Sequence, residues 1–593
     1  MTHTEIELTR DVDAIQIPSG DVVHLPVGTK VMITQALGGT YTVATQSGLA
    51  RIKAENADAL GIDLEAEKAK QSSAQEAIAD GDVQGAVWEQ LKLVFDPEHA
   101  AAVLAHPLLA GDGAPPAPRV LESKERELLS VYYDTPDDRL RQAGVFLRVR
   151  STGTGYVQTI KTARAESEFL ERREWECDLP TRAFDLSAAE GTALEPLLSD
   201  TVRAALGPRF ETRFLRRTFL IDDGGSLIEV AVDQGDIVAG EASARICELE
   251  LELKSGSAAR LFGLAKQFAE TIPLTLSVKT KAERGYDLLD GGEPEFEKAL
   301  PVDIPPDETC ANAFRIAARN CLRQILVNLP GTRAGKPESL HQMRVGLRRM
   351  RAAVLLFGDL VDGPHRRQIA AELKWIGNQL GHARDLDVFN SDIVGPHRAE
   401  YPEDPGWKAV EGRVREARQV AQKAAVEATG SARFRTALLN LGAWIEFGDW
   451  TGNDNRLAAE PVADYAASKL SRLRRTLVKK GNNLPKLSVA ERHKVRILAK
   501  RMRYGSEFFG ATFPGKRQAK RCRKALAALE SLQDSLGTLN DIANRQTIFN
   551  LGNHGHEPET WPMPKVDPGE EKALMKTAKH AYARFADVKP FWK

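Results

Sequence analysis

Three glutamates at alternate positions, Glu248, Glu250 and Glu252, are followed at the same spacing by Lys254. Alternate residues of a β-strand point to one face of its sheet, so these carboxylates would lie side by side. Their mutual repulsion is costly unless cations or a metal ion lie between them. Carboxylate oxygens in a row suit a hard divalent cation, and the segment therefore predicts a site for Mg²⁺ or Mn²⁺.

Charged residues alternate in the same way along other strand-like segments between Lys92 and about Gly291. They are Arg148, Arg150, Lys161, Arg172, Glu174, Glu176, Arg213, Arg217, Glu229 and Asp233. Opposite charges on one face of successive strands suit a barrel whose charged face lines its lumen. Arginine clamps phosphate bidentately while a metal ion neutralises the remaining charge, which is what phosphoryl transfer requires.

A second pattern occurs twice in the latter half of the chain. The first basic stripe is His341, Arg344, Arg348 and Arg351, and the second basic stripe is His493, Arg496, Lys500 and Arg503. Steps of three, four and three residues keep each stripe on one face of an α-helix. Like charges at this spacing repel each other, so two matching stripes indicate a polyanionic ligand.

The latter half carries further marks of duplication. The segments LGHARDLD (380–387) and LGTLNDIA (536–543) match each other, and each follows its own stripe. Apolar residues recur there with helical periodicity, broken by Pro and Gly turns. The repeat predicts two tandem helical bundles related by pseudo-symmetry, after a stiff linker at 301–306.

The charge is divided unevenly along the chain. From Pro306 onward Lys and Arg number 49 against 31 Asp and Glu, a balance of +18, whereas the preceding part has 32 against 51, a balance of −19. This asymmetry indicates that the latter half binds acidic ligands and that the former gathers carboxylates. Aromatic residues are only 6% of the chain and do not alternate with the stripes, which favours a sequence-independent polyanion over specific nucleic-acid binding.

Cysteine content and hydropathy bear on the compartment. The five cysteines show neither metal-binding spacing nor the even number of a disulfide framework, which is typical of a reducing compartment. No uncharged run is long enough to span a bilayer, and the first residues lack the apolar core of a signal peptide. We therefore predict a cytoplasmic protein with no membrane partner; its oligomeric state does not follow from the sequence.

Residues 9–91 form a separate segment. Short Val- and Ile-rich runs alternate with Pro and Gly turns up to about Leu60, which predicts a small β unit followed by a charged helix. The segments TRDVDAIQIPSG, GGTYTV and VQGAVWEQLK resemble the N-terminal part of SufT-type iron–sulfur assembly proteins. The domain that normally follows in those proteins is missing here, so we expect a packing or spacer module instead of an iron–sulfur role.

Residues 92–300 resemble a CYTH domain, the triphosphate tunnel fold. The resemblance rests on FLRVR, on Arg172-x-Glu174-x-Glu176, on VDQGD around Asp233, on ELELELK and on KAERGYDL with Lys281 and Arg284. It implies an eight-stranded antiparallel tunnel that binds a triphosphate through Arg and Lys and a divalent metal through Glu. Members of this family include inorganic triphosphatases, thiamine triphosphatases and some adenylate cyclases.

The opening strand departs from that family's E-x-E-x-K pattern. Trp88 and Gln90 occupy the glutamate positions before Lys92, whereas Glu5 and Glu7 stand near the start of the chain. Joining residues 1–8 directly to Lys92 restores the pattern, so residues 9–91 are hypothesised to interrupt the first tunnel strand. Either the strand is rebuilt and Glu5 and Glu7 join the metal site, or the WEQLK segment occupies the position; the sequence leaves both open.

Residues 306–593 resemble the CHAD domain, a helical module associated with polyphosphate. The two basic stripes match its motif, Arg384 and Asp385 match its downstream motif, and the second copy has Asn540 and Asp541 there. The resemblance implies a polyphosphate site formed by both stripes together with Arg384.

These interpretations combine into an α+β multidomain protein: a small β-rich N-terminal unit, an eight-stranded antiparallel β tunnel and duplicated all-α helical bundles. The predicted function is metal-dependent hydrolysis of inorganic triphosphate or a related polyphosphate, with polyphosphate binding by the helical half. Glu174 or Glu176 is expected to orient the attacking water. The expected phosphate ligands are Lys92, Arg148, Arg150, Lys161, Arg172, Arg213, Arg217, Lys281 and Arg284.

Two alternatives to this function stay open. The insertion would leave a polyphosphate-binding protein if it disables the tunnel, and metal-dependent turnover separates that protein from the hydrolase. A nucleotide cyclase has no distinguishing residue in this sequence.

Overall fold

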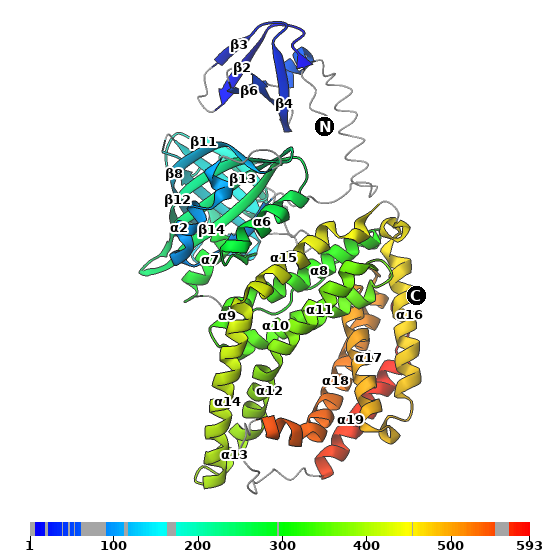
Figure 1. The fold of residues 1–593 in the computed structure, drawn as a ribbon. Helices are drawn as coiled ribbons and strands as arrows, with labels where there is room; N and C mark the ends of the chain where they lie inside the picture. Colours follow the sequence, from blue (N-terminus) through cyan, green and yellow to red (C-terminus); the bar gives the residue numbers. More distant parts are fainter. Residues whose placement is uncertain are drawn as a thin grey trace. The chain divides into compact units, whose positions relative to one another are not determined.

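The structure is a computed structural model of the 593-residue chain (Figure 1). It describes residues 6–17, 22–37, 40–45, 48–52, 54–60, 90–111, 117–153, 155–162, 174–292, 296–452, 455–551 and 568–593. The chain divides into two compact units, Met1–Gly85 and Ala86–Lys593. The second unit contains a large β-sheet followed by a long series of helices.

The first unit is a small antiparallel β-sheet, as the alternation of apolar runs and turns predicts. Its strand order is β1-β4-β5-β6-β2-β3. The strands are β1 (Ile6–Glu7), β2 (Val12–Ile17), β3 (Val22–Leu25), β4 (Lys30–Leu37), β5 (Thr40–Thr45) and β6 (Gly48–Ile52), followed by the 3₁₀ segment Ala54–Leu60. Val12, Ala14, Val43 and Ile52 are buried in its core. The helix expected at the end of residues 9–91 lies outside the described residues.

Glu7 belongs to this small sheet. It pairs with Lys30 of β4, and the following Leu8 is buried and donates its backbone N–H to the carbonyl of Thr29 at 3.0 Å. Burial of Leu8 thus joins the first strand to the N-terminal core. The hypothesis that Glu7 lies on a tunnel strand is therefore corrected, while Glu5 lies outside the described residues.

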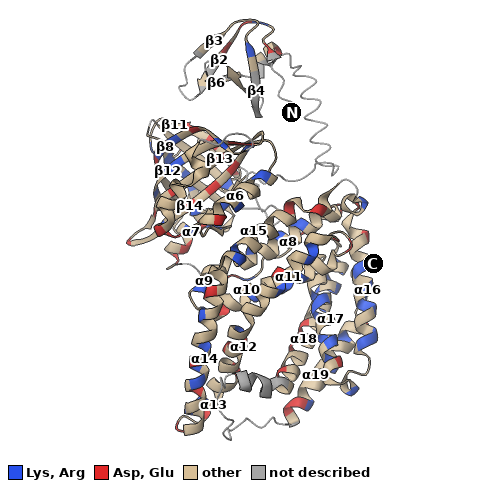
Figure 2. Cartoon of the chain, viewed as in Figure 1, with Lys and Arg blue, Asp and Glu red and all other residues tan. Residues whose placement is uncertain are grey.

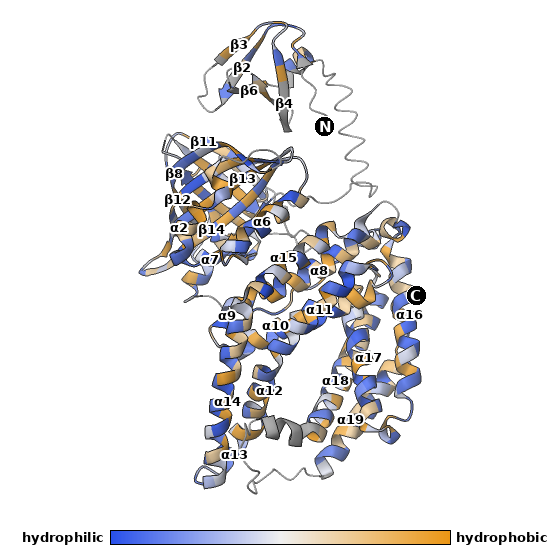
Figure 3. Ribbon diagram, viewed as in Figure 1, coloured by the Kyte–Doolittle hydropathy of each residue, from blue (hydrophilic) through white to orange (hydrophobic). Residues whose placement is uncertain are grey.

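The large sheet of the second unit is antiparallel throughout. Its order is β11-β10-β9-β8-β12-β13-β14-β7-β15. The strands are β7 (Gln90–Val94), β8 (Arg119–Asp134), β9 (Val145–Ser151), β10 (Tyr156–Thr162), β11 (Glu174–Leu179), β12 (Gly207–Asp223), β13 (Ser226–Ala239), β14 (Ala242–Ser255) and β15 (Thr275–Leu276). The predicted antiparallel fold is confirmed, with the two-residue β15 as a ninth strand. Polar and apolar residues are mixed along these strands (Figure 3).

Strand β7 occupies the opening position beside β14. Its register pairs Gln90 with Glu252, Lys92 with Glu250 and Val94 with Glu248. The other edge of β7 pairs with β15. Of the two alternatives for the opening strand, the structure therefore has the one in which the strand comes from the end of the WEQLK segment, from Gln90 onward.

Within the described ranges, six helices are interspersed along the chain with the strands of the large sheet. They are α2 (Ala100–Leu104), α3 (Pro107–Ala110), α4 (Arg139–Gln142), α5 (Asp200–Ala205), α6 (Ala259–Thr271) and α7 (Lys281–Leu289). Helix α7 begins with a capping box, because the Thr280 hydroxyl accepts from the backbone of Glu283 and the Glu283 carboxylate accepts from that of Thr280. This cap fixes the first turn of α7, which carries Lys281 and Arg284.

The remainder of the second unit is helical. Its helices are α8 (Cys310–Val327), α9 (Leu329–Arg333), α10 (Pro337–Leu356), α11 (Pro364–Gln379), α12 (Gly381–Phe389), α13 (Gly395–Glu400), α14 (Pro405–Gly430), α15 (Ala432–Phe447), α16 (Val462–Gly481), α17 (Val489–Phe508), α18 (Lys516–Leu551) and α19 (Pro568–Asp587). The two basic stripes lie on α10 and α17, as predicted. In the described part of the chain, none of the helices has both the length and the apolar character needed to cross a bilayer.

One hydrophobic core runs from the large sheet into the helical part. It includes Leu91 and Leu249 of the sheet and Phe314 of α8. Helix α6 contacts α15, where the ring of Phe262 lies 6.1 Å from that of Phe447. The two parts are therefore packed together through buried apolar side chains.

Candidate functional site

Three buried carboxylates from two neighbouring strands form the centre of the sheet's charged face. They are Asp233 of β13 and Glu248 and Glu250 of β14. One oxygen from each lies within 4.8 Å of the others. Asp233 pairs directly with Glu248 in the strand register, which brings the two side chains to the same face.

Four cations surround these carboxylates. The Lys281 ammonium lies 2.7 Å from Asp233 and donates to Glu248 at 2.6 Å and to Glu250 at 3.0 Å. The Lys92 ammonium lies 3.1 Å from Glu248 and 3.2 Å from Glu250. Arg216 of β12, which pairs with Glu250, and Arg284 of α7, which pairs with Glu248, supply the other two positive charges. Side chains from the sheet and from α7 thus form one ion-pair network.

The network sets the pKa values of its members. Burial disfavours the charged form of Glu248, but Lys281 and Lys92 outweigh it and lower its pKa to about 2. The same two ammonium groups, with Arg216, hold the pKa of Glu250 well below its usual range. The carboxylates in turn raise the pKa of Lys281 above its ordinary value, against the effect of burial. All three groups are therefore charged at neutral pH.

The donor set of the cluster fits a divalent metal ion. Three carboxylate oxygens within 4.8 Å of one another are the hard ligands that Mg²⁺ and Mn²⁺ prefer. Glu252 lies outside this set, because its carboxylate is part-exposed and accepts from Lys254 at 2.7 Å. A metal ion at Asp233, Glu248 and Glu250 would compete with the ammonium groups that hold these carboxylates.

Two arginines of β9 lie on the same face of the sheet. Arg148 is buried and donates to the Thr159 hydroxyl at 2.9 Å, and that hydroxyl donates to Glu176 at 3.1 Å. Arg150 donates from Nε to the Ser130 hydroxyl at 3.0 Å. Burial, followed by the neighbouring Arg148, lowers the pKa of Arg150 to about 10. Among the described residues, no carboxylate lies within 4.0 Å of the Arg150 guanidinium, so its charge is available to an anion.

The sequence also predicts two further phosphate ligands, Lys161 and Arg172, and two candidates for orienting water, Glu174 and Glu176. Lys161 of β10 pairs with Glu174 of β11, in register with the face that carries Arg148. The side chain of Glu176 is about half exposed and lies 3.8 Å from Arg148. Arg172 lies outside the described residues.

The prediction for β12 is corrected by one residue. Arg216 pairs with Asp233 in the strand register, so Arg213 and Arg217 lie on the opposite face. Arg213 forms an ion pair with Glu211, and Arg217 donates to Glu125 at 2.5 Å. Sequence alternation alone could not choose between adjacent arginines, because the register of the partner strand decides which one faces the cluster.

Arg216 and Asp233 are site residues that the predicted ligand set omits. Arg216 donates to both Asp233 oxygens, at 2.7 and 2.6 Å, and to Glu250 at 2.6 Å. The VDQGD motif and the parity of Asp233 with Glu229 were the signals for the carboxylate. For the arginine the sequence offered no such signal, because the register between β12 and β13 decides which arginine faces Asp233.

The two basic stripes come together in the helical part. Helices α10 and α17 are in contact, and Lys and Arg residues are spread along both (Figure 2). Burial, with Arg496, Arg348 and Arg503, lowers the pKa of Lys500 to about 7. The charge of Arg348 in the first stripe therefore affects the pKa of Lys500, as do the charges of its own stripe.

The first stripe also meets the motif on α12. Burial, followed by Arg384, lowers the pKa of His341 to about 4, so this imidazole is neutral at pH 7. Arg344 lies 3.9 Å from Asp385. In the second copy, His493 lies 3.2 Å from the side-chain oxygen of Asn540. Arg351 is exposed at the end of its stripe.

In both copies of the repeat, a glycine lies close to the arginine at the same position of the stripe. A methyl group at Gly381 of α12 would lie 3.1 Å from Nη1 of Arg344, and one at Gly537 of α18 would lie 3.6 Å from the guanidinium of Arg496. In each copy, the glycine of the LG segment therefore lies with no side chain of its own beside the equivalent arginine of the stripe. This equivalence agrees with the duplication predicted from the sequence.

Comparison with known proteins connects the two parts to families. Residues 110–286 match the CYTH domain model and residues 316–549 match the CHAD domain model. An inorganic triphosphatase from Haemophilus influenzae is 36% identical over 172 residues, which are 28% of this chain and 47% of that protein. The chain thus spans about half the length of this curated relative.

Solved structures also show likeness, at low TM-scores. The CHAD domain from the plant Ricinus communis is 27% identical, with a TM-score of 0.38, and the match covers 49% of this chain and 93% of that one. PptA from Streptomyces chartreusis is 18% identical, with a TM-score of 0.30, and the match covers 47% and 95% of the two chains. The family models alone carry the assignment: this chain contains a CYTH domain followed by a CHAD domain.

Proposed function

We propose that the sheet's charged face hydrolyses inorganic triphosphate or a related polyphosphate, and that the basic stripes bind polyphosphate. The observation that carries the proposal is the pair formed by the buried Arg148 and the part-buried Arg150 beside a carboxylate cluster. Arg150 has its positive charge uncompensated by any carboxylate within 4.0 Å among the described residues, which suits an anionic substrate. The inorganic triphosphatase relative supports the same substrate class.

In this proposal the basic residues bind the substrate and the acidic residues bind the metal ion or orient the attacking water. Arg148, Arg150 and Lys161 would bind phosphate oxygens, joined by Lys92, Lys281 and Arg284 from the ion-pair network. Asp233, Glu248 and Glu250 would hold Mg²⁺ or Mn²⁺, which when bound neutralises phosphate charge. Glu176 would orient water toward the terminal phosphorus, since it already accepts a hydrogen bond at 3.1 Å from Thr159; Glu174 is the second candidate for this role.

A second candidate function is polyphosphate binding without turnover. It is favoured by the opening strand, where Gln90 stands opposite Glu252, and by the ammonium groups that already neutralise the three carboxylates. Both features reduce the negative charge available to a metal ion. In this case the tunnel face would be an anion site without a metal-dependent reaction.

Phosphate release from inorganic triphosphate by the full chain tests the proposal. The reaction is followed with Mg²⁺, with Mn²⁺ and with chelator, beside Arg150→Gln and the matched control Arg213→Gln, whose side chain lies on the opposite face. Metal-dependent turnover that is lost in Arg150→Gln and kept in Arg213→Gln would support hydrolysis. Retained triphosphate binding without turnover under any condition would establish the second candidate instead.

Polyphosphate binding by the stripes is tested separately by salt dependence. Ion pairs with a polyanion weaken as ionic strength rises, so the affinity should fall steeply with salt. Arg348→Gln combined with Arg496→Gln should weaken binding and flatten that dependence. Lys494→Gln, on α17 but outside the stripe, is the matched control, and an equal loss in this variant would count against the stripe assignment.

A further inference from the structure

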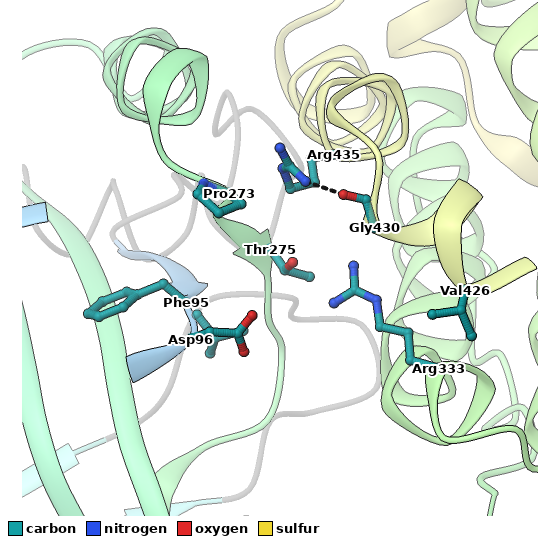
Figure 4. Close-up of a pocket in the computed structure, with 9 residues that line it drawn as sticks. Phe95, Asp96, Pro273, Thr275, Arg333, Val426, Gly430 and Arg435 are labelled. Carbon is teal, nitrogen blue, oxygen red and sulfur yellow. Dashed lines mark hydrogen bonds between the residues drawn. The ribbon is translucent and has the colours of Figure 1, made fainter. Parts of the chain in front are cut away.

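A cavity of about 260 Å³ lies between the CYTH and CHAD domains, and none of its lining residues belongs to the two sites described above. It is lined by Val94, Phe95, Asp96, Pro273, Thr275, Arg333, Val426, Gly430 and Arg435 (Figure 4). Drug-sized ligands occupy pockets of roughly 300 to 1,000 Å³, so this one suits a smaller ligand. Its residues come from both domains, which makes it a junction between them.

Two arginines direct their guanidinium groups toward this cavity. Arg333, the last residue of α9, and Arg435, in the first turn of α15, lie around it, with Asp96 and Thr275 on the sheet side (Figure 4). Each guanidinium donates to one backbone carbonyl near the end of α14: Arg333 to Thr429 at 2.6 Å, and Arg435 to Gly430. These bonds fix the orientation of both groups.

Capping of α14 does not account for all the donors of these arginines. The Nε atoms of both are buried and have no hydrogen-bond partner among the described residues. Burial is the main reason that the pKa of each is lowered; at Arg333 the charge of Asp96 opposes this effect and that of Arg435 adds to it. Two like charges with unsatisfied donors at one cavity are costly unless an acceptor enters it.

We propose that this cavity binds a phosphate group, with Arg333 and Arg435 as its donors. Oxygen acceptors would satisfy both guanidinium groups, and the Thr275 hydroxyl would give a further hydrogen bond. The buried Phe95 and the Val426 side chain form an apolar wall that strengthens these interactions by excluding water. Asp96 opposes them in charge, so a partly protonated phosphate fits the site better than a fully charged one.

The phosphate group has two chemical sources. It is either free inorganic phosphate, which the proposed hydrolysis would release, or the terminal group of a polyphosphate chain. The site adjoins the charged face of the large sheet through β7, because Asp96 follows the strand that carries Lys92. A ligand here would therefore contact both the β7 end and the α14–α15 joint. The assignment of the cavity itself rests on its own residues and not on the proposed hydrolysis.

Hydrogen–deuterium exchange of the full chain tests the site locally. Inorganic phosphate, or inorganic triphosphate with chelator present, is added at millimolar concentration, and exchange is followed in residues 426–436 and 93–97. We expect protection of both segments in the unaltered protein and its loss in Arg333→Gln/Arg435→Gln. Arg433→Gln is the matched control on α15, because Arg433 pairs with Glu372 at 2.9 Å.

Asp96→Asn provides a second variant with the opposite expected effect. Removing this negative charge should lower the phosphate concentration for half-maximal protection by roughly fivefold. Protection by inorganic phosphate identifies the free ion as the source, and protection by triphosphate alone identifies a chain terminus. The proposal is overturned if neither probe protects, if protection persists in the double variant, or if Asp96→Asn weakens it. Arg150→Glu should leave this protection intact, which separates it from events in the tunnel.

Discussion

Arg216 forms a two-bond ion pair with Asp233, through hydrogen bonds of 2.7 and 2.6 Å, while the adjacent Arg217 points to the other face of the sheet. A one-residue difference in strand position thus separates a buried ion pair from a part-exposed one. Breaking the first leaves a buried carboxylate without its partner, whereas breaking the second leaves both groups near water.

Substitution of these two arginines should have unequal effects on stability. Arg216→Gln is expected to destabilise the second unit by about 3 kcal/mol, because Asp233 and Glu250 lose a buried cation. Arg217→Gln should cost less than about 1 kcal/mol, since its Glu125 partner is exposed. The check is the shift of the urea unfolding midpoint measured by tryptophan fluorescence; equal shifts would contradict the register described here.

Removal of Asp233 should impair the use of metal ions. Asp233→Asn is expected to raise the Mn²⁺ concentration for half-maximal triphosphate turnover by about tenfold or more, because one of three clustered carboxylates is lost. Asp236→Asn is the control on the same strand, where Asp236 pairs with the exposed Arg245 at 3.0 Å. Metal titrations of both variants, with thermal unfolding as a check of folding, decide the point. An unchanged metal requirement in Asp233→Asn would exclude this carboxylate as a ligand.

Polyphosphate affinity should depend on pH through Lys500. In the free protein its pKa is lowered to about 7, by burial and then by Arg496, Arg348 and Arg503. A bound polyanion favours the charged ammonium and raises this pKa, so binding takes up a proton above pH 7. Affinity should therefore fall as pH rises from about 7 to about 9, and Lys500→Arg should remove most of the fall. Titration calorimetry in buffers of different ionisation enthalpy measures the proton uptake directly; its absence would refute the coupling.

The two glycines beneath the stripes should respond differently to alanine. Gly381→Ala adds a methyl group 3.1 Å from Nη1 of Arg344, which must move, whereas Gly537→Ala meets Arg496 at an ordinary 3.6 Å. We expect a severalfold loss of polyphosphate affinity for Gly381→Ala and little change for Gly537→Ala. Neither should be less stable, because alanine favours a helix by about 1 kcal/mol over glycine. Affinity and thermal unfolding of both variants are the measurements, and similar affinities would argue against Arg344 as a ligand.

Much of the candidate site follows from local sequence periodicity. The i, i+2 spacing of Glu248 and Glu250 places both carboxylates on one strand face, and the 3-4-3 spacing of the stripes places them on helices α10 and α17. These features depend on the geometry of a single element. They can therefore be derived without knowledge of its partners.

The errors arise where two elements must be aligned. Whether Arg216 or Arg217 faces Asp233 depends on the register between β12 and β13, which alternation within one strand leaves undetermined. The opening strand depends on burial of Leu8 in a separate core, which holds Glu7 in the N-terminal sheet. The cavity between Arg333 and Arg435 joins residues about 100 positions apart and has no local signature.

The CYTH and CHAD domains share one hydrophobic core, so proteolysis of the chain between them should not by itself separate them. Cleavage between residues 292 and 310 would leave the two apolar surfaces with no covalent link but still packed at α6 and α15. Separating the fragments would expose side chains such as Phe262, whose ring lies beside that of Phe447, and this favours aggregation of each piece. A nicked protein should therefore migrate as one particle under native conditions, and the domains should lose their structure together.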